Sequence, residues 1–366
     1  MEKNEKLDAL LEDYKDSIIS NEDMIGDGYD DMSKLFYHIN KKFLYLLDND
    51  PEVAVTLKDI KFRKKFYTLL QKFGHLALKC DQQIENRNFL ENPESPDIKE
   101  DKGIKLPDKP VIFVANHGFR DDILATVLAA NRHAYIYLGS LPEFYNTTNG
   151  IAMYLVGDIM FNRKSKESKT ASVKKIERLL DLGTDLIMFP EGGWNKSINE
   201  ITLPLWHGVY KFSKLNNYDV VPIAHYIRDP EILEKNNKIH TVVDDPIPLY
   251  EMEEKEALNY LRDVLSSWQY KMMEIYGKST REKEVNGKDS NEVWDERLTE
   301  RMKSVGRYDS SIETKSDFRD KNISRPEDVF GPIADIKNIK KENANMVVQS
   351  RKLVKELKHN DFQRRY

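Results

Sequence analysis

The sequence predicts an α/β fold: an αβα layered domain with a mostly parallel mixed sheet, an N-terminal helical hairpin and a charged, mainly helical C-terminal extension. Three observations lead to this prediction. Short apolar runs alternate with segments of helical periodicity from residue 110 to residue 245. Apolar residues recur at helical spacing before this region, between residues 33 and 77. After residue 277, charge is dense and apolar residues are sparse.

The alternating region supplies the predicted elements of the α/β domain. Strands are expected at residues 111–115, 134–138, 158–161, 185–189, 219–226 and 238–243. Helices are expected at residues 121–131, 142–155, 167–182, 206–215 and 252–276. In sheets of this kind, ligands bind at the carboxyl ends of the strands. The turns that follow residues 115, 161 and 189 are therefore expected to share one edge of the sheet.

The chain is expected to divide into four parts. Residues 1–32 form an acidic lead-in, 33–90 the helical hairpin, 91–276 the α/β domain with a proline-containing linker at 91–109, and 277–366 the extension. In the hairpin, apolar side chains from Phe62 to Ala77 share one helical face beside many lysines. Residues 58–80 are either an amphipathic helix for an anionic membrane interface or a helix packed on the sheet with a solvated basic face. The two interpretations are compatible.

Composition limits the class of protein. The formal net charge is −5, so no nucleic-acid partner is expected. A single cysteine, Cys80, excludes an internal disulfide framework and a cysteine-based zinc site. Neither a secretory signal nor a membrane-spanning apolar run is visible. We therefore expect a cytoplasmic protein, with peripheral contact at the cytoplasmic face of a membrane as the one membrane association.

The segment Asn116–Asp122 joins a predicted strand to a predicted helix. Asp122 lies five residues after His117. This is a poor spacing on one helix, but a strand-to-helix turn can bring the aspartate back to the imidazole. Such a pair fixes the histidine tautomer and leaves the other ring nitrogen to take a proton. The alternative is an aspartate that caps the helix and a histidine that bonds to a loop.

Three further segments carry chemistry-bearing residues. Gly157–Arg163 places an arginine after a strand, where it could bind phosphate or a carboxylate, or simply be solvated. Phe189–Asn195 contains Glu191 between a proline and two glycines, which suits either a ligand site or an ordinary turn with an exposed glutamate. Pro222 lies inside an apolar strand, which implies a bulge or an edge strand.

Taken in order, these segments resemble the motifs of the glycerolipid acyltransferases, the family of 1-acylglycerol-3-phosphate acyltransferases. The shared residues are Asn-His-x-x-x-x-Asp, Gly-x-x-x-Phe-x-Arg, Phe-Pro-Glu-Gly and an apolar Val-Pro-Ile strand, and the resemblance covers residues 110–245. It implies an acyltransferase that moves an acyl group from acyl-CoA or acyl carrier protein to an acceptor hydroxyl, most simply that of a lysophospholipid. The thioester is a co-substrate, and neither a cofactor nor a metal site is implied.

The resemblance also implies roles for individual residues. His117 would be the general base and Asp122 would orient it, Arg163 would bind the acceptor phosphate, and Pro222 would lie beside the acyl donor. Glu191 and Gly192 would hold the acceptor and shape the site. The positions assigned to substrate binding are Asn116, Phe161, Arg163, Glu191, Gly192, Gly193, Trp194 and Pro222.

The sequence departs from the family pattern at two places. The threonine and arginine that commonly follow Phe-Pro-Glu-Gly are replaced by Gly193 and Trp194, and Phe119 replaces a small hydroxyl residue in the first motif. These changes keep open a glycan or other non-glycerolipid hydroxyl acceptor. A non-catalytic relative that binds acyl carriers or membrane is a second alternative. A third is a metal-dependent hydrolase using His117, His207 and His225, whose spacing matches no compact metal motif.

Overall fold

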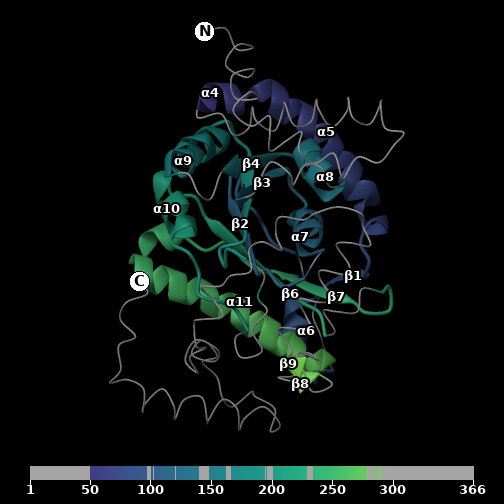
Figure 1. The fold of residues 1–366 in the computed structure, drawn as a ribbon. Coiled ribbons are helices and arrows are strands. Elements are labelled where there is room, and N and C mark those ends of the chain that lie inside the picture. The colour runs from purple at the N-terminus through teal and green to yellow at the C-terminus, as the bar shows by residue number, and fades with distance from the viewer. Residues whose placement is uncertain are drawn as a thin grey trace, which may run out of the picture. The chain divides into compact units, whose positions relative to one another are not determined.

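The computed structural model describes residues 50–277 and 284–289, apart from short gaps at 97–99, 102, 120, 140–147, 162–165, 194, 196–200, 229–233 and 286–287. The described residues form two compact units. The first contains the residues up to Phe73 and those from Arg132 to Met188. The second contains Gly74–Asn131 and the residues from Phe189 onward, up to Arg297. Figure 1 labels the helices and strands of both units.

The first unit is built around three parallel strands in the order β5-β3-β4. These are β3 (Ala134–Gly139), β4 (Asp158–Phe161) and β5 (Asp185–Met188). Its helices are α4 (Pro51–Ala54), α5 (Leu57–Phe73), α8 (Thr148–Val156) and α9 (Lys166–Asp181). Helix α9 packs on β4 and β5, α8 packs on α5, and α4 packs on α9. The short loop between α8 and β4 requires Gly157, whose φ is +124° and whose added Cβ would lie 2.5 Å from the Tyr135 ring.

The second unit contains four strands in the order β1-β7-β6-β2. They are β1 (Gln82–Ile84), β2 (Ile112–Ala115), β6 (Val220–Tyr226) and β7 (Ile239–Val243). Strand β2 pairs in parallel with β6, and β1 pairs in parallel with β7. Strands β6 and β7 are antiparallel. All residues of β2 and β6 are buried. Strand β2 is apolar throughout, β6 is apolar apart from His225, and both strands are covered on both faces.

Helices on both sides of these strands complete the second unit. Figure 1 shows β6 and β7 between α7 (Asp122–Ala130) and α11 (Glu254–Tyr276), and both helices contact β6. The other elements are η2 (Gly74–Leu76), α6 (Arg87–Glu91), α10 (Gly208–Leu215), η4 (Leu249–Glu251) and the hairpin of β8 (Glu284–Val285) with β9 (Lys288–Asp289). Beneath α7, a core cluster joins Leu78, Cys80, Phe119, Ala125, Ile227 and Ile239.

The structure confirms the predicted α/β class and its mostly parallel, mixed sheet. Each strand predicted between residues 111 and 243 is present, and one pairing among them is antiparallel. Three strands were not predicted. Gln82–Ile84 lies within the segment expected to be a helical hairpin, and the two-residue strands Glu284–Val285 and Lys288–Asp289 lie within the extension expected to be mainly helical. The first part of the expected helical hairpin, residues 33–49, and the extension beyond residue 289 lie outside the described residues.

The proline in the Val-Pro-Ile strand does not mark an edge, so that interpretation was wrong. Strand β6 has β2 on one side and β7 on the other. The bulge alternative is correct. Ile223 is opposite Val243 and Val220 is opposite Ile247, so three steps along β6 correspond to four along its partner. Pro222 accepts a hydrogen bond from the Asp244 N–H (2.9 Å) but has no N–H to return, and β7 ends at this point.

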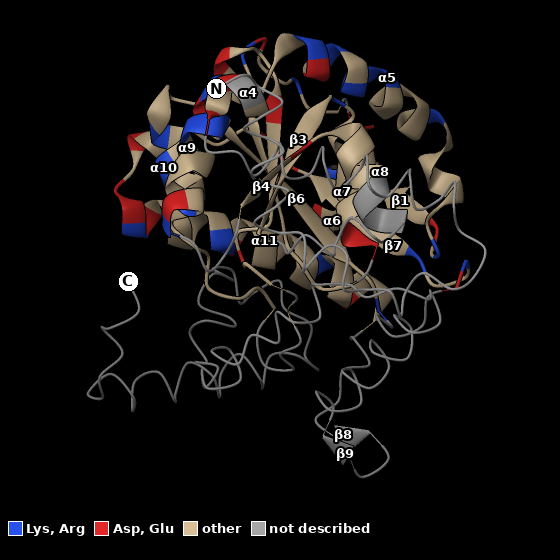
Figure 2. Ribbon diagram, turned by 45° about the horizontal axis from the view of Figure 1, so that its top comes forward, with Lys and Arg blue, Asp and Glu red and all other residues tan. Residues whose placement is uncertain are grey.

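Helix α5 packs through a different stripe from the apolar one that the sequence indicated. Its buried residues are Ile60, Arg63 and Tyr67. Within the predicted apolar stripe, Phe62, Leu69 and Phe73 are 48%, 53% and 59% exposed. Figure 2 shows lysines and arginines along the same helix. Among the described residues, no helix combines the length and apolar character needed to cross a bilayer.

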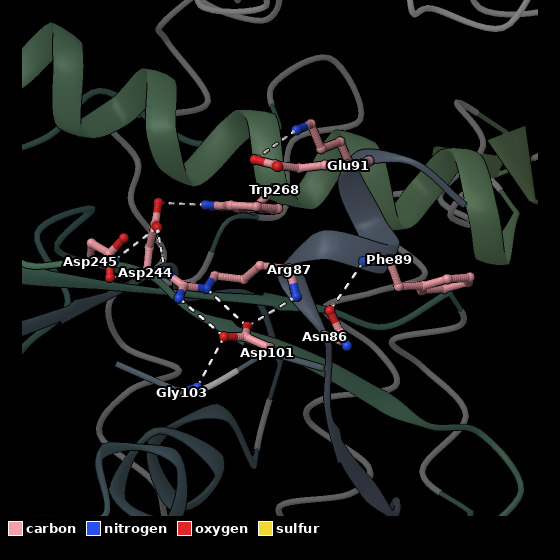
Figure 3. A network of polar contacts seen from close by, with 10 residues as sticks. Asn86, Arg87, Phe89, Glu91, Asp101, Gly103, Asp244, Asp245 and Trp268 are labelled. Atoms are coloured by element: carbon pink, nitrogen blue, oxygen red, sulfur yellow. Dashed lines mark hydrogen bonds and ion pairs between the residues drawn. The ribbon is translucent and has the colours of Figure 1, made fainter. Parts of the chain in front are cut away.

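Within the second unit, ion pairs and hydrogen bonds connect Asp101, in the predicted linker, to Arg87 of α6 and through it to the residues after β7 (Figure 3). Arg87 on α6 binds both carboxylate oxygens of Asp101, at 2.9 and 3.1 Å, and its third nitrogen lies 3.0 Å from Asp245. Asp244 accepts a hydrogen bond from the Trp268 indole of α11 (2.6 Å). The hydrogen bonds from Arg87 lower the pKa of Asp101.

Candidate active site

The His117 turn begins where β2 ends and finishes at the first residue of α7. The chain reverses over Gly118 and Phe119, which returns Asp122 to the imidazole. His117 Nδ1 lies 2.8 Å from Asp122 Oδ2. The pairing that the spacing suggested is therefore present in the structure.

The Asp122 carboxylate is completely buried (0% exposed) and organises the turn. Its Oδ2 also accepts hydrogen bonds from the backbone N–H groups of Gly118 (2.9 Å) and Phe119 (3.1 Å). All three donors precede the helix, so this carboxylate holds the turn and does not cap its own helix. The three donors therefore fix the position of the carboxylate next to the imidazole. Its neighbour Asp121 instead accepts from the backbone N–H of Lys79 (2.8 Å).

The His117 ring lies between this buried carboxylate and Phe189, the residue that follows β5. The two ring centroids are 4.8 Å apart at an interplanar angle of 40°. The side chain is 12% exposed, so the imidazole is reachable from outside. A carboxylate on Nδ1 favours the tautomer whose Nε2 lone pair can accept a proton. The arrangement is thus that of an oriented general base.

Glu191 is not the exposed glutamate of an ordinary turn, because its side chain is 0% exposed. One carboxylate oxygen accepts from the His117 N–H (2.8 Å), and the other accepts from the Leu203 N–H (2.7 Å). The carboxylate therefore joins the histidine turn to the chain on the far side of the 192–202 loop. Its predicted contact with an acceptor stays a prediction.

The start of that loop is shaped by glycine. Gly192 has a φ of +72°, and a Cβ added to it would lie 2.6 Å from the indole nitrogen of Trp206. Gly193 is buried next to it, and the Asn195 N–H donates to the His117 carbonyl (2.6 Å). The Asn195 side chain donates to the Ile201 carbonyl (3.1 Å). Trp194 lies outside the described residues.

Asn116 also has a contact that the sequence did not reveal. Its side-chain oxygen accepts from the His225 N–H (2.7 Å) and its amide nitrogen donates to the His225 carbonyl (3.0 Å). The same amide nitrogen donates to Gln269 on α11 (3.1 Å), and Gln269 donates to Thr202 (2.8 Å). These partners are far apart in sequence and belong to none of the motifs, so no local pattern could have identified them.

The remaining predicted site residues are placed as follows. Pro222 is buried in β6, opposite Val114 of β2, whose end leads into the turn. Phe161 belongs to the first unit, where its ring stacks on Tyr137 at 4.8 Å. Arg163 lies outside the described residues. Among the residues that the structure describes, no group of three or more histidine, cysteine, aspartate or glutamate side chains could hold a metal ion.

Comparison with known proteins finds similarity to a family model, to a curated protein and to solved structures. A family model described as Acyltransferase matches residues 87–226. A 1-acyl-sn-glycerol-3-phosphate acyltransferase of Chlamydomonas reinhardtii is 29% identical over 118 residues, which is 32% of this chain and 34% of that protein. The chain thus matches about a third of the length of this curated relative. The crystal structure of the 1-acyl-sn-glycerophosphate acyltransferase PlsC from Thermotoga maritima is similar with a TM-score of 0.42 and 18% identity, covering 63% of this chain and 86% of that one.

Proposed function

We propose that this chain, whose residues 87–226 match the Acyltransferase family model, is an O-acyltransferase that uses a thioester donor. The donor is acyl-CoA or acyl carrier protein, and the acceptor is the hydroxyl of a lysophospholipid such as 1-acylglycerol-3-phosphate. One observation carries the proposal: an accessible imidazole lies 2.8 Å from a buried carboxylate, which also accepts hydrogen bonds from two backbone N–H groups of the turn. The matching relative supports the choice of acceptor.

The proposed reaction needs a single base. His117 Nε2 takes the proton of the acceptor hydroxyl as that oxygen attacks the carbonyl carbon of the thioester. The tetrahedral intermediate collapses, the C–S bond breaks, and the leaving thiolate takes the proton back from the imidazolium. Asp122 stabilises the imidazolium in between. No acyl-enzyme forms, and Cys80 is buried in the core cluster under α7.

Acceptor recognition is assigned to residues around the base. Arg163 would bind the phosphate bidentately, and Phe161 belongs to the same Gly-x-x-x-Phe-x-Arg segment. Glu191 and Gly192 would shape the acceptor side, with the Glu191 carboxylate held by the N–H groups of His117 and Leu203. Gly193 and Trp194 stand where the family commonly has threonine and arginine. An aromatic surface in place of a cation favours a glycan or other hydroxyl compound as the second candidate acceptor.

Helix α5 would bring the enzyme to its lipid substrate at the cytoplasmic face of the membrane. Phe62, Leu69 and Phe73 are exposed on this helix, and lysines lie between them in the sequence. Apolar insertion together with attraction to anionic lipid gives interfacial binding. In sedimentation with vesicles of anionic phospholipid, Leu69→Glu and Phe73→Glu should reduce binding, whereas Thr68→Glu in the same helix should reduce it less.

The proposed activity is tested by following thiol release from acyl-CoA with 1-acylglycerol-3-phosphate as acceptor. Mass spectrometry of the products identifies where the acyl group goes, and a parallel reaction with glycan acceptors tests the second candidate. The wild-type protein should form the diacyl product and folded His117→Ala should lose at least 100-fold in turnover. Unchanged turnover in His117→Ala would overturn the mechanism, and absence of transfer to every acceptor would favour a non-catalytic binding protein.

A further inference from the structure

We propose that His225, a residue outside every motif of the family, is a positioning residue that holds both halves of the His117–Asp122 turn. The inference rests on the proposed acyl transfer. His225 is on β6, 99 residues after Thr126 of α7, and its side chain is 1% exposed. It touches neither reacting group directly. It is instead connected to each of them by one intermediate residue.

The first connection runs through the backbone of His225 to the residue before the base. Asn116 bonds to both the N–H and the carbonyl of His225, at 2.7 and 3.0 Å, as a neighbouring strand would. Strand β2 ends at Ala115, so this side chain extends the pairing with β6 by one residue. The position of the His117 backbone is therefore fixed against the strand that carries His225.

The second connection runs through the imidazole of His225 to the helix that begins with Asp122. The Thr126 hydroxyl donates to the Asp122 carbonyl (2.7 Å) and lies 2.8 Å from His225 Nε2. A hydroxyl has one hydrogen, and here the carbonyl receives it. His225 Nε2 must therefore carry its own hydrogen and donate to Thr126, which fixes the tautomer of His225.

The same reasoning accounts for the other side of the ring. With Nε2 protonated, Nδ1 is an acceptor, and the Thr241 hydroxyl lies 2.9 Å away as donor. Gln82 in turn donates to the Thr241 oxygen (3.0 Å) and to the Ala125 carbonyl of α7 (2.9 Å). Each donor in this chain has an acceptor, so the network favours one arrangement of its side chains.

The charge state agrees with this role. Burial lowers the pKa of His225 to about 4, and the nearby Asp122 carboxylate opposes that shift. The imidazole is therefore neutral at the pH of catalysis and keeps both its donor and its acceptor. Phe119, inside the turn, packs edge-to-face on the same ring with centroids 6.0 Å apart. His225 thus contacts the turn at its middle as well as supporting its two ends.

The experiment compares two amide replacements of His225, asparagine and glutamine, in the full-length protein. Glutamine can place an amide N–H near the position of Nε2 and keep the bond to Thr126, whereas the shorter asparagine cannot. We expect His225→Asn to lower kcat by roughly 10- to 100-fold, the scale of a small misplacement of a catalytic group, with KM changed less than threefold. His225→Gln should recover most of kcat. Thr126→Val should lower kcat similarly, and Thr126→Ser should restore it.

A matched control separates positioning from stability. His240 is a second buried histidine, opposite Tyr226 in the adjacent strand, and it bonds to Glu85 (2.7 Å), away from the turn. His240→Asn should lower the melting temperature at least as much as His225→Asn but leave kcat within twofold in the folded enzyme. Equal kcat losses in the two variants, or full activity in His225→Asn, would overturn the proposal.

The double variant His225→Asn/Thr126→Val gives an independent readout. If the two residues act through one contact, its kcat should match that of either single variant and not the product of both effects. Multiplicative effects would contradict the connection through Thr126. A failure of the proposed function is distinguishable, because the wild-type protein would then transfer no acyl group before any variant was compared.

Discussion

Replacing Asp122 by asparagine separates the charge of the buried carboxylate from its shape. All three donors, His117 Nδ1 and the N–H groups of Gly118 and Phe119, converge on a single oxygen. An asparagine that presents its oxygen there keeps all three hydrogen bonds. What the substitution removes is the negative charge beside the imidazole, so it tests the electrostatic part of the proposed mechanism.

The structure gives the expected size of the effect. Two unit charges about 4 Å apart near a protein surface interact by about 4 kcal/mol, which corresponds to roughly a 1,000-fold loss of kcat for Asp122→Asn. The two backbone hydrogen bonds become neutral and weaken by about 1 kcal/mol each. Burying an amide in place of a carboxylate offsets part of that loss. Stability should therefore fall by less than about 2 kcal/mol.

The assay follows thiol release at neutral pH in parallel with urea denaturation. Asp121→Asn is the matched control, because it makes the same chemical change one residue earlier, where the carboxylate accepts from Lys79 and not from His117. It should keep turnover within about threefold, the effect of a change that leaves the base in place. If Asp122→Asn retains more than a tenth of the wild-type kcat, the charge is not needed and the reasoning is refuted.

Three further predictions concern stability. Gly192→Ala should destabilise the protein by about 1–3 kcal/mol in urea, because of its φ of +72° and the contact with Trp206, and adding Trp206→Ala should restore only part of this. Arg87 lowers the pKa of Asp101, so this contact stabilises the protein above about pH 4 and is lost as the pH falls further. Arg87→Met should therefore unfold more easily at pH 7 and show a flatter pH dependence below pH 4; equal slopes would contradict this. The pKa of His225 falls from 6.5 to about 4 on folding, so the unfolded state binds its proton first and wild-type stability should drop by roughly 3 kcal/mol between pH 6.5 and pH 4. His225→Gln should lack that part of the slope, measured by denaturation at each pH.

The elements of this fold that could be predicted are those whose pattern lies in consecutive residues. Strand β2 is apolar throughout and β6 is apolar apart from His225, and both are bounded by turns, so their identity follows from the sequence. Strand β1 has only Gln82, Gln83 and Ile84, and it forms because β7 offers it a partner 157 positions away, as the pairing of Gln82 with Ile239 shows. In helix α5, apolar residues do recur at helical spacing, but several of them are exposed. The buried residues of this helix are Ile60, Arg63 and Tyr67.

The same distinction holds for the candidate site. His117 and Asp122 are five residues apart, and their pairing was predictable because the turn alone brings them together. Glu191 receives its hydrogen bonds from residues 74 and 12 positions away, and only the folded chain shows that its carboxylate faces inward. For His225, the sequence suggests only a role as a metal ligand. Its hydrogen-bond partners Thr126 and Thr241 lie 99 and 16 positions away, at spacings that match no motif.

Hydrogen bonds connect His117 to the chain on both sides of positions 196–200. Glu191 and Asn195 attach the beginning of the loop to His117, and the same glutamate anchors the returning chain at Leu203. The contacts that hold His117 therefore come from described residues on both sides of positions 196–200. Replacing the stretch between Asn195 and Ile201 would therefore test whether this part of the sequence selects the hydroxyl acceptor while the contacts of Glu191 with His117 and Leu203 are kept.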